Sequence, residues 1–310
     1  MLLKILLFTT LCTAAPSHDE LVAMGRKPVP PAMPKRTIAP PATQPAGEMI
    51  DLVDGDVKFK LFIPPEYHIA ADGRINLTVH FHTVYWFILD EHLRRGLNEP
   101  LAMFALGEGS STYRKPFLDV DRFDRIVKLI ESTLGERMGP ADARVTQIDI
   151  TSFSAGYGAV RELVEQDRYI NLMRRIILCD SLYASWEPAS TQPGATSRPA
   201  EENIGPWRKF IDLAAKGEKT FVLTHSMVPT GYANTAACAK ALIDIVGAPV
   251  TAIKLNETEA AKDPEYPIAY RADLGHFHVW GYHGEDAQAH MTHVRHMAEV
   301  WRALDACGDR

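Results

Sequence analysis

Apolar and polar positions follow two different periods along the chain after residue 48. Residues 57–64 ("VKFKLFIP") alternate with the period of two that is typical of a β-strand, and residues 75–82 ("INLTVHFH") form a β-branched, apolar run. Residues 120–136 instead repeat their apolar positions every three or four residues, which is the period of an amphipathic helix. The sequence therefore predicts strands and helices that alternate, as in βαβ units.

The same pattern continues to the C-terminus. Strands are expected at 101–107, 144–150, 174–180, 219–226, 250–256 and 276–282, and helices at 159–166, 207–218, 236–248 and, as one long final helix, 285–306. This alternation predicts an α/β fold with a mostly parallel central sheet and helices on both faces. Ligands of such sheets bind at the carboxyl ends of the strands, so functional residues should directly follow the strand segments.

The N-terminal region has a different character. Residues 1–15 contain Lys4, an apolar stretch and small residues at Ala14 and Ala15, the layout of a secretory signal peptide. Seven prolines lie between Lys27 and Gly47, so we expect residues 16–47 to be a proline-rich linker outside the packed domain. The predicted organisation is a signal peptide at 1–15, a linker at 16–47 and one domain at 48–310, in a protein that is secreted or periplasmic.

Composition excludes several classes of protein. The chain has 310 residues, 46% of them apolar, and a net charge of −6, so nothing favours binding to nucleic acid or to an anionic membrane. No window after the signal peptide is long and apolar enough to span a bilayer. The four cysteines form no C-x-x-C pair, and one bridge, Cys238 to Cys307, is considered. The oligomeric state is left open.

The most specific motif lies between the strand that ends near Ile150 and the following helix. It reads Ser152-Phe153-Ser154-Ala155-Gly156, with small residues two positions before and after Ser154. This resembles the nucleophile elbow of α/β-hydrolases, G-x-S-x-G, with Ser152 in place of the first glycine. The resemblance implies an α/β-hydrolase fold and a nucleophilic Ser154.

A second match follows the strand at 75–82. In α/β-hydrolases, backbone N–H groups of the loop after the corresponding strand join the N–H that follows the nucleophile and bind the oxyanion. The resemblance implies Ala155 as the first donor and Thr83 or Val84 as the second, although this loop lacks the glycine that the family has there.

The remaining members of a catalytic triad are chosen from the family order of serine, acid and histidine. Among the C-terminal histidines, His290 at the start of the final helix is the favoured base, and His283 is the alternative. Residues 224–238 contain no Asp or Glu, so the favoured acid is Asp180 at the end of the strand next to Ser154, with Asp273 as the second choice.

The predicted function is that of a secreted serine hydrolase that cleaves a carboxylic ester or an amide through an acyl-enzyme and needs no cofactor. Its partner would be a small-molecule ester or a peptide. Aromatic candidates for lining the substrate site are Tyr85, Trp86, Tyr113, Trp186 and Trp207.

Two other functions are considered. His80 and His82 lie two residues apart on one strand, which is also the spacing of ligands in metal-dependent hydrolases. Ser152 and Thr83 stand where the α/β-hydrolase pattern has glycine. These departures are also compatible with a binding protein that has a hydrolase fold and impaired catalysis.

Overall fold

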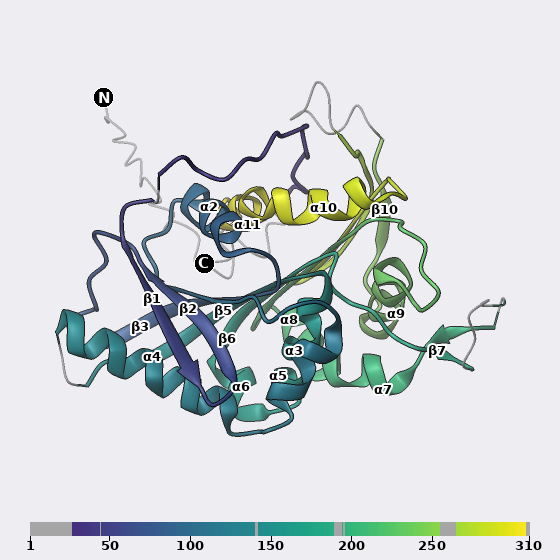
Figure 1. The fold of residues 1–310 in the computed structure, drawn as a ribbon. Coiled ribbons are helices and arrows are strands. Elements are labelled where there is room, and N and C mark those ends of the chain that lie inside the picture. Colours follow the sequence, from purple (N-terminus) through teal and green to yellow (C-terminus); the bar gives the residue numbers. More distant parts are fainter. Residues whose placement is uncertain are drawn as a thin grey trace, which may run out of the picture.

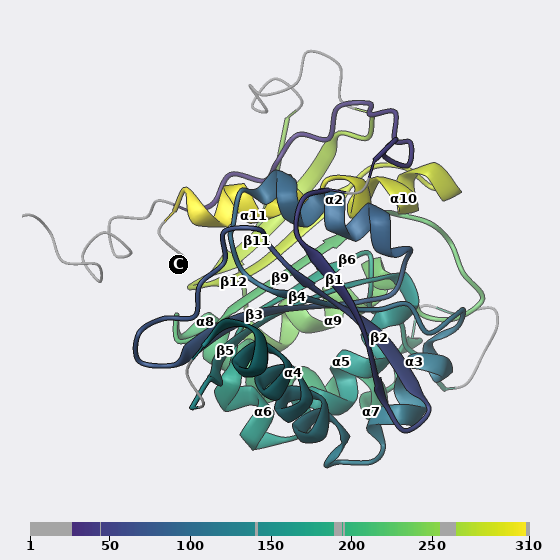
Figure 2. The same cartoon turned by 60° about the vertical axis from the view of Figure 1, so that its left-hand side comes forward.

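A sheet of ten strands forms the centre of the computed structural model, which describes residues 27–43, 45–139, 142–188, 194, 196–254 and 265–307 (Figures 1 and 2). The strands lie in the order β1 (Glu48–Asp54), β2 (Val57–Ile63), β4 (Leu101–Phe104), β3 (Arg74–Phe81), β5 (Arg144–Phe153), β6 (Met173–Cys179), β9 (Thr220–His225), β12 (Phe277–Tyr282), β11 (Ile268–Leu274) and β10 (Val250–Ala252). The six strands from β4 to β12 in this order are parallel, and antiparallel pairs extend both edges.

Helices cover both faces of this sheet. One face carries α2 (Tyr85–Arg95), α10 (Ala287–Arg295) and α11 (Met297–Asp305) (Figure 1). The other carries α3 (Ser110–Phe117), α4 (Arg122–Met138), α5 (Tyr157–Val164), α6 (Asp167–Leu172), α8 (Arg208–Ala215) and α9 (Thr235–Val246). Shorter elements are η1 (Ser154–Gly156), α7 (Glu201–Ile204), η2 (Gly205–Trp207) and the two-stranded pair β7 (Trp186–Glu187) and β8 (Arg198–Pro199). The predicted fold class is confirmed.

The predicted strands and helices of the parallel region are found close to their expected positions, but α2 was missed. Its buried face includes Glu91, His92 and Arg95, and these charged or titratable residues interrupt the apolar pattern on which the prediction depended. The antiparallel strands β1 and β11 and the short helix α3 were also missed.

The predicted long final helix is wrong, because it is divided at His296. Here the backbone leaves the helical region (φ −122°, ψ 22°), and two helix ends meet. The carbonyl of Arg295 accepts a hydrogen bond from Arg36 Nη1 (3.0 Å), and Glu91 Oε2 accepts one from the N–H of Ala298 (2.9 Å). Side chains remote in the sequence therefore satisfy the backbone groups that the break exposes.

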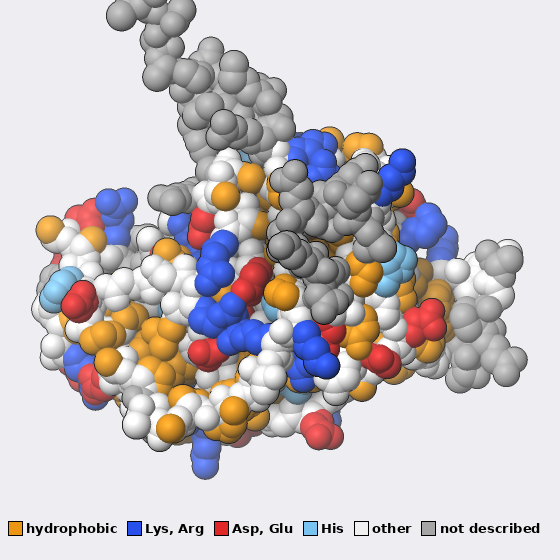
Figure 3. Space-filling model, turned by 90° about the horizontal axis from the view of Figure 1, so that it is seen from above, with side chains coloured by type: hydrophobic (Ala, Val, Ile, Leu, Met, Phe, Trp, Pro, Cys, Tyr) orange, Lys and Arg blue, Asp and Glu red, His pale blue; other side chains and the backbone are white. Residues whose placement is uncertain are grey.

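The described part of the proline-rich segment, residues 27–43, packs against the domain, whereas the sequence predicted a linker outside it. Met33 is fully buried in the apolar cluster beneath α2 and α11, and the Pro31 carbonyl accepts a hydrogen bond from Tyr282 Oη (2.9 Å). Arg36 forms ion pairs with Asp90 and Glu91 of α2. Figure 3 looks onto this face, where basic and acidic side chains lie close together.

Two further expectations concern the cysteines and the membrane. Cys179 and Cys238 are buried free thiols, so Cys238 forms no bridge to Cys307. Within the described ranges, no helix is both long and apolar enough to cross a bilayer.

Replacing Met33 by alanine tests whether this segment is part of the folded domain. Because the side chain is fully buried, we expect Met33→Ala to lower the free energy of unfolding by about 2 kcal/mol or more. The control is Val29→Ala in the same segment, where the side chain is 67% exposed and the change should stay within about 0.5 kcal/mol. Urea denaturation of the two variants measures both values, and equal effects would contradict the packing.

Candidate active site

Three neighbouring parallel strands end in residues with an unusual backbone. His82 and Thr83 follow β3 with φ of 78° and 83°, Ser154 follows β5 with φ of 48°, and Asp180 follows β6 with φ of 45°. Residues other than glycine lose about 1–3 kcal/mol each in such conformations, and these conformations concentrate at functional sites. The three strand ends are thus the candidate site.

Ser154 lies at a sharp turn between β5 and α5. The turn brings the backbone of Gly156 so close to β3 that a Cβ there would lie 2.3 Å from the carbonyl oxygen of Phe81, which only glycine avoids. Ser154 itself is half-buried and reaches a cavity. The structure therefore has the strand, turn and helix that the elbow motif requires.

Ser152, which replaces the first glycine of the motif, is buried and hydrogen-bonded. Its Oγ lies 2.8 Å from Ser181 Oγ, and Ser181 Oγ donates to the carbonyl oxygen of Ser154 (2.8 Å). Because the proton of Ser181 is used in that second bond, Ser152 is the donor in the first. This chain of hydrogen bonds connects the turn after β5 to the turn after β6.

The structure brings His290 and Asp180 together. His290 Nδ1, on α10, lies 2.8 Å from Asp180 Oδ2, and Ser226 Oγ donates to the same oxygen (2.5 Å). Burial opposes ionisation of this carboxyl group, but the hydrogen bond from His290, the electrostatic effect of the His293 and His290 imidazoles and the hydrogen bond from Ser226 together outweigh it and lower the pKa of Asp180 to about 2. Asp180 is therefore an ionised acceptor at neutral pH.

An aromatic stack fixes the plane of the His290 ring. The ring lies against Phe153, with centroids 4.5 Å apart, and the other partner of Phe153 is the ring of His82 at 5.9 Å. Phe153 directly precedes Ser154, so the residue that ends β5 also supports the imidazole.

His80 supports the loop that carries Thr83 and Val84. Its Nε2 lies 2.6 Å from the carbonyl oxygen of His82, and its Nδ1 lies 2.7 Å from Thr151 Oγ1. A carbonyl oxygen only accepts, so Nε2 carries the proton, and burial lowers the pKa of His80 to about 3.

The contacts of His80 and His82 concern the alternative that these two residues bind a metal ion. Both ring nitrogens of His80 are engaged by the protein, and His82 Nδ1 lies 2.9 Å from Tyr113 Oη. In the part of the chain that the structure describes, no three His, Cys, Asp or Glu residues are grouped as metal ligands would be. His80 thus has no ring nitrogen left to share an ion with His82.

The other candidate residues lie elsewhere. His283 is exposed between β12 and α10, and Asp273 is buried next to His278, whose Nδ1 is 2.7 Å away. Neither residue contacts the turn at Ser154 in any bond described.

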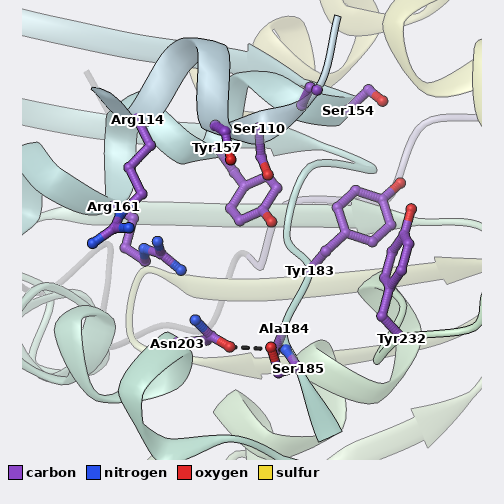
Figure 4. Close-up of a pocket in the computed structure, with 13 residues that line it drawn as sticks. Ser110, Arg114, Ser154, Tyr157, Arg161, Tyr183, Ala184, Ser185, Asn203 and Tyr232 are labelled. Atoms are coloured by element: carbon purple, nitrogen blue, oxygen red, sulfur yellow. Dashed lines mark hydrogen bonds between the residues drawn. The ribbon is translucent and has the colours of Figure 1, made fainter. Parts of the chain in front are cut away.

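A cavity of about 610 Å³ opens beside Ser154 (Figure 4). None of the five aromatic residues expected to line the substrate site lines this cavity, although Tyr113 contacts His82. Its walls instead carry Tyr157, Tyr183 and Tyr232, together with the charged residues Arg114 and Arg161. Ser154, Tyr157 and Arg161 are spaced as i, i+3 and i+7. This helical spacing could have indicated that Tyr157 and Arg161 lie on the same side of the helix as Ser154.

No family model and no curated protein matches the sequence. Among solved structures, the chain is similar to a feruloyl esterase module from Clostridium thermocellum, with 10% identity, coverage of 95% of this chain and 96% of that one, and a TM-score of 0.47. It is also similar to a cold-adapted esterase from an Arctic intertidal metagenomic library, with 12% identity, coverage of 83% and 91%, and a TM-score of 0.43.

Substitution of the two buried serines tests the hydrogen-bonded chain. Ser181→Ala leaves both Ser152 Oγ and the Ser154 carbonyl without this partner, so we expect a loss of about 1–3 kcal/mol in the free energy of unfolding. Ser152→Ala leaves the bond from Ser181 to Ser154 intact and should cost less. In a double-mutant cycle measured by urea denaturation, the double variant should lose less than the sum of the single losses. Additive losses would contradict the chain.

The buried imidazole of His293 predicts how stability depends on pH. Burial lowers its pKa to about 3, and its Nδ1 lies 2.9 Å from Thr224 Oγ1. Between about pH 6.5 and 3 the unfolded chain binds a proton at this residue that the folded protein does not, so stability falls as the pH falls. We expect His293→Gln to reduce that slope by up to about 1.4 kcal/mol per pH unit. Denaturation between pH 7 and 4 measures it, and an unchanged slope would contradict a neutral His293.

Proposed function

We propose that this protein is a serine hydrolase that cleaves a carboxylic ester through an acyl-enzyme formed on Ser154. The observation that carries the proposal is the hydrogen bond between Asp180 and His290, at the edge of the sheet where Ser154 lies on its strained turn. Asp180 follows the strand next to β5, and α10 carries His290 across the same strand ends.

The hydrogen bonds assign the protons that the chemistry needs. Because Asp180 is ionised and only accepts, the proton of a neutral His290 is on Nδ1. The lone pair of Nε2 is then available as a base. Phe153 restricts rotation of the ring, so the imidazole keeps this orientation.

In the proposed reaction, Ser154 Oγ attacks the ester carbonyl while His290 Nε2 removes its proton. His290 then gives that proton to the leaving alcohol, and a water molecule hydrolyses the acyl-serine by the same steps in reverse. The N–H groups of Ala155 and of Thr83 or Val84 would bind the oxyanion. The left-handed backbone of His82 and Thr83 supports this assignment, because a conformation usual for glycine is present although the glycine is absent.

The cavity beside Ser154 supports a small molecule as the substrate, and the proposed reaction requires no cofactor. We also propose that the protein is exported, on the basis of the N-terminal pattern; residues 1–26 lie outside the described part of the chain. Mass spectrometry of the N-terminus of secreted or periplasmic protein would identify cleavage after Ala15.

Removing the nucleophile gives the direct test of the proposal. Ser154→Ala should reduce the hydrolysis of 4-nitrophenyl butyrate by at least about a thousandfold and abolish labelling by a fluorophosphonate, because no other group supplies the attacking oxygen. Circular dichroism should show an unchanged fold. Retained turnover would reject the assignment.

The two candidate bases serve as test and control. His290→Ala should lower kcat by about as much as Ser154→Ala, since residues of a triad act as one unit. His283→Ala, a change at an exposed histidine of the same region, should leave kcat within about twofold. The reverse result would move the base to His283.

A further inference from the structure

Two arginines lie at the end of the cavity opposite Ser154 (Figure 4). Among the described residues that line the cavity, Arg114 and Arg161 carry the only formal charges, and no Asp or Glu lines it. The side chain of Arg161 is 11% exposed, so its charge is held in a largely dehydrated position. A buried guanidinium group in a ligand cavity favours an anionic partner.

The acidic groups around these arginines do not line the cavity. Glu162 accepts a hydrogen bond from Arg114 Nε (2.8 Å) and lies 3.6 Å from Arg161 Nε, so one carboxylate is shared by two guanidinium groups. Glu165 and Glu202 are exposed, and together with Glu162 and the same two arginines they line a second hollow of about 150 Å³, where water screens their charge. On the cavity side, the described lining therefore carries only the guanidinium charges.

The helix places this charge and the nucleophile at two ends of one cavity. Ser154 and Arg161 are seven residues apart along η1 and α5, and both line the cavity (Figure 4). The rings of Tyr157 and Tyr183 lie between them, with centroids 5.6 Å apart, and Tyr232 extends this wall at 5.5 Å from Tyr183. The middle of the cavity therefore presents aromatic surface rather than charge.

From these observations we propose that the substrate is an ester that carries a carboxylate at the end remote from the scissile carbonyl, with Arg161 and Arg114 binding the carboxylate. The fork of donors on each guanidinium group fits the two oxygens of a carboxylate. The carbon chain or ring between the ester and the carboxylate packs against the tyrosines. The inference rests on the proposed ester hydrolysis, because it places the ester at Ser154.

A matched pair of substrates tests the inference. The mono-4-nitrophenyl ester of octanedioic acid and 4-nitrophenyl octanoate have acyl chains of the same length, and only the first ends in a carboxylate. We expect the wild-type protein to have a higher kcat/KM for the anionic ester. Arg161→Gln should lower that value by about 10- to 100-fold and change the value for the neutral ester by less than about threefold.

Further variants separate binding from folding. Arg114→Gln changes a half-exposed side chain and should lower kcat/KM for the anionic ester in the same direction. Arg161→Lys should restore part of the preference, since it keeps the charge and loses the fork. Arg168→Gln is the matched control, because Arg168 pairs with Asp121 and Asp124 at the surface and does not line the cavity. An unchanged ratio of the two esters in both Arg161→Gln and Arg114→Gln would overturn the inference.

A binding measurement keeps the inference distinct from the proposed function. Calorimetry with Ser154→Ala and octanedioate should show binding that Arg161→Gln weakens at least about tenfold, whereas the uncharged octanamide binds both proteins equally. If the wild-type protein hydrolyses the neutral ester but octanedioate shows no dependence on Arg161, the inference fails and the proposed function stands. If octanedioate binds through Arg161 but no ester is cleaved, the proposed function fails.

Discussion

Neighbouring parallel strands β3, β5 and β6 end at one edge of the sheet, and each continues into a residue held at positive φ without the help of glycine. The cost of this conformation has to be met by contacts around it. His80 bonds to the carbonyl of His82, Ser181 bonds to the carbonyl of Ser154, and Asp180 accepts from His290 and Ser226. The polar residues at this edge thus maintain the turns on which the proposed chemistry depends.

These contacts also connect residues from helices on the two faces of the sheet. The turn at Ser154 begins α5, on the face with the cavity, whereas His290 comes from α10 on the opposite face. Asp180 and Phe153 lie between them at the strand ends and contact the imidazole from two directions. The proposed triad therefore depends on α10 being placed correctly, and α10 ends where Arg36 of the proline-rich segment bonds to the Arg295 carbonyl.

That last contact gives the N-terminal segment a structural role. Proline-rich composition predicts an extended chain, and the described segment does lack helices and long strands. Composition does not say whether such a chain lies against a surface. Here Met33 occupies an apolar site beneath α2 and α11, and Arg36 neutralises acidic residues of α2.

Local sequence was sufficient for the features that depend on neighbours in the chain. Alternation in β2 and short apolar runs predicted the strands of the parallel region. A period of 3.6 predicted α4, α5, α8 and α9, and the small residues around Ser154 predicted the turn between strand and helix. The preference for His290 and Asp180 came from the order of residues in a family, and the structure places these two side chains in contact. Tertiary contacts alone decided the rest. The break at His296 depends on Arg36 and Glu91. The cavity walls come from α3, η1, α5, α7 and two loops, because a pocket is formed by residues that only folding brings together.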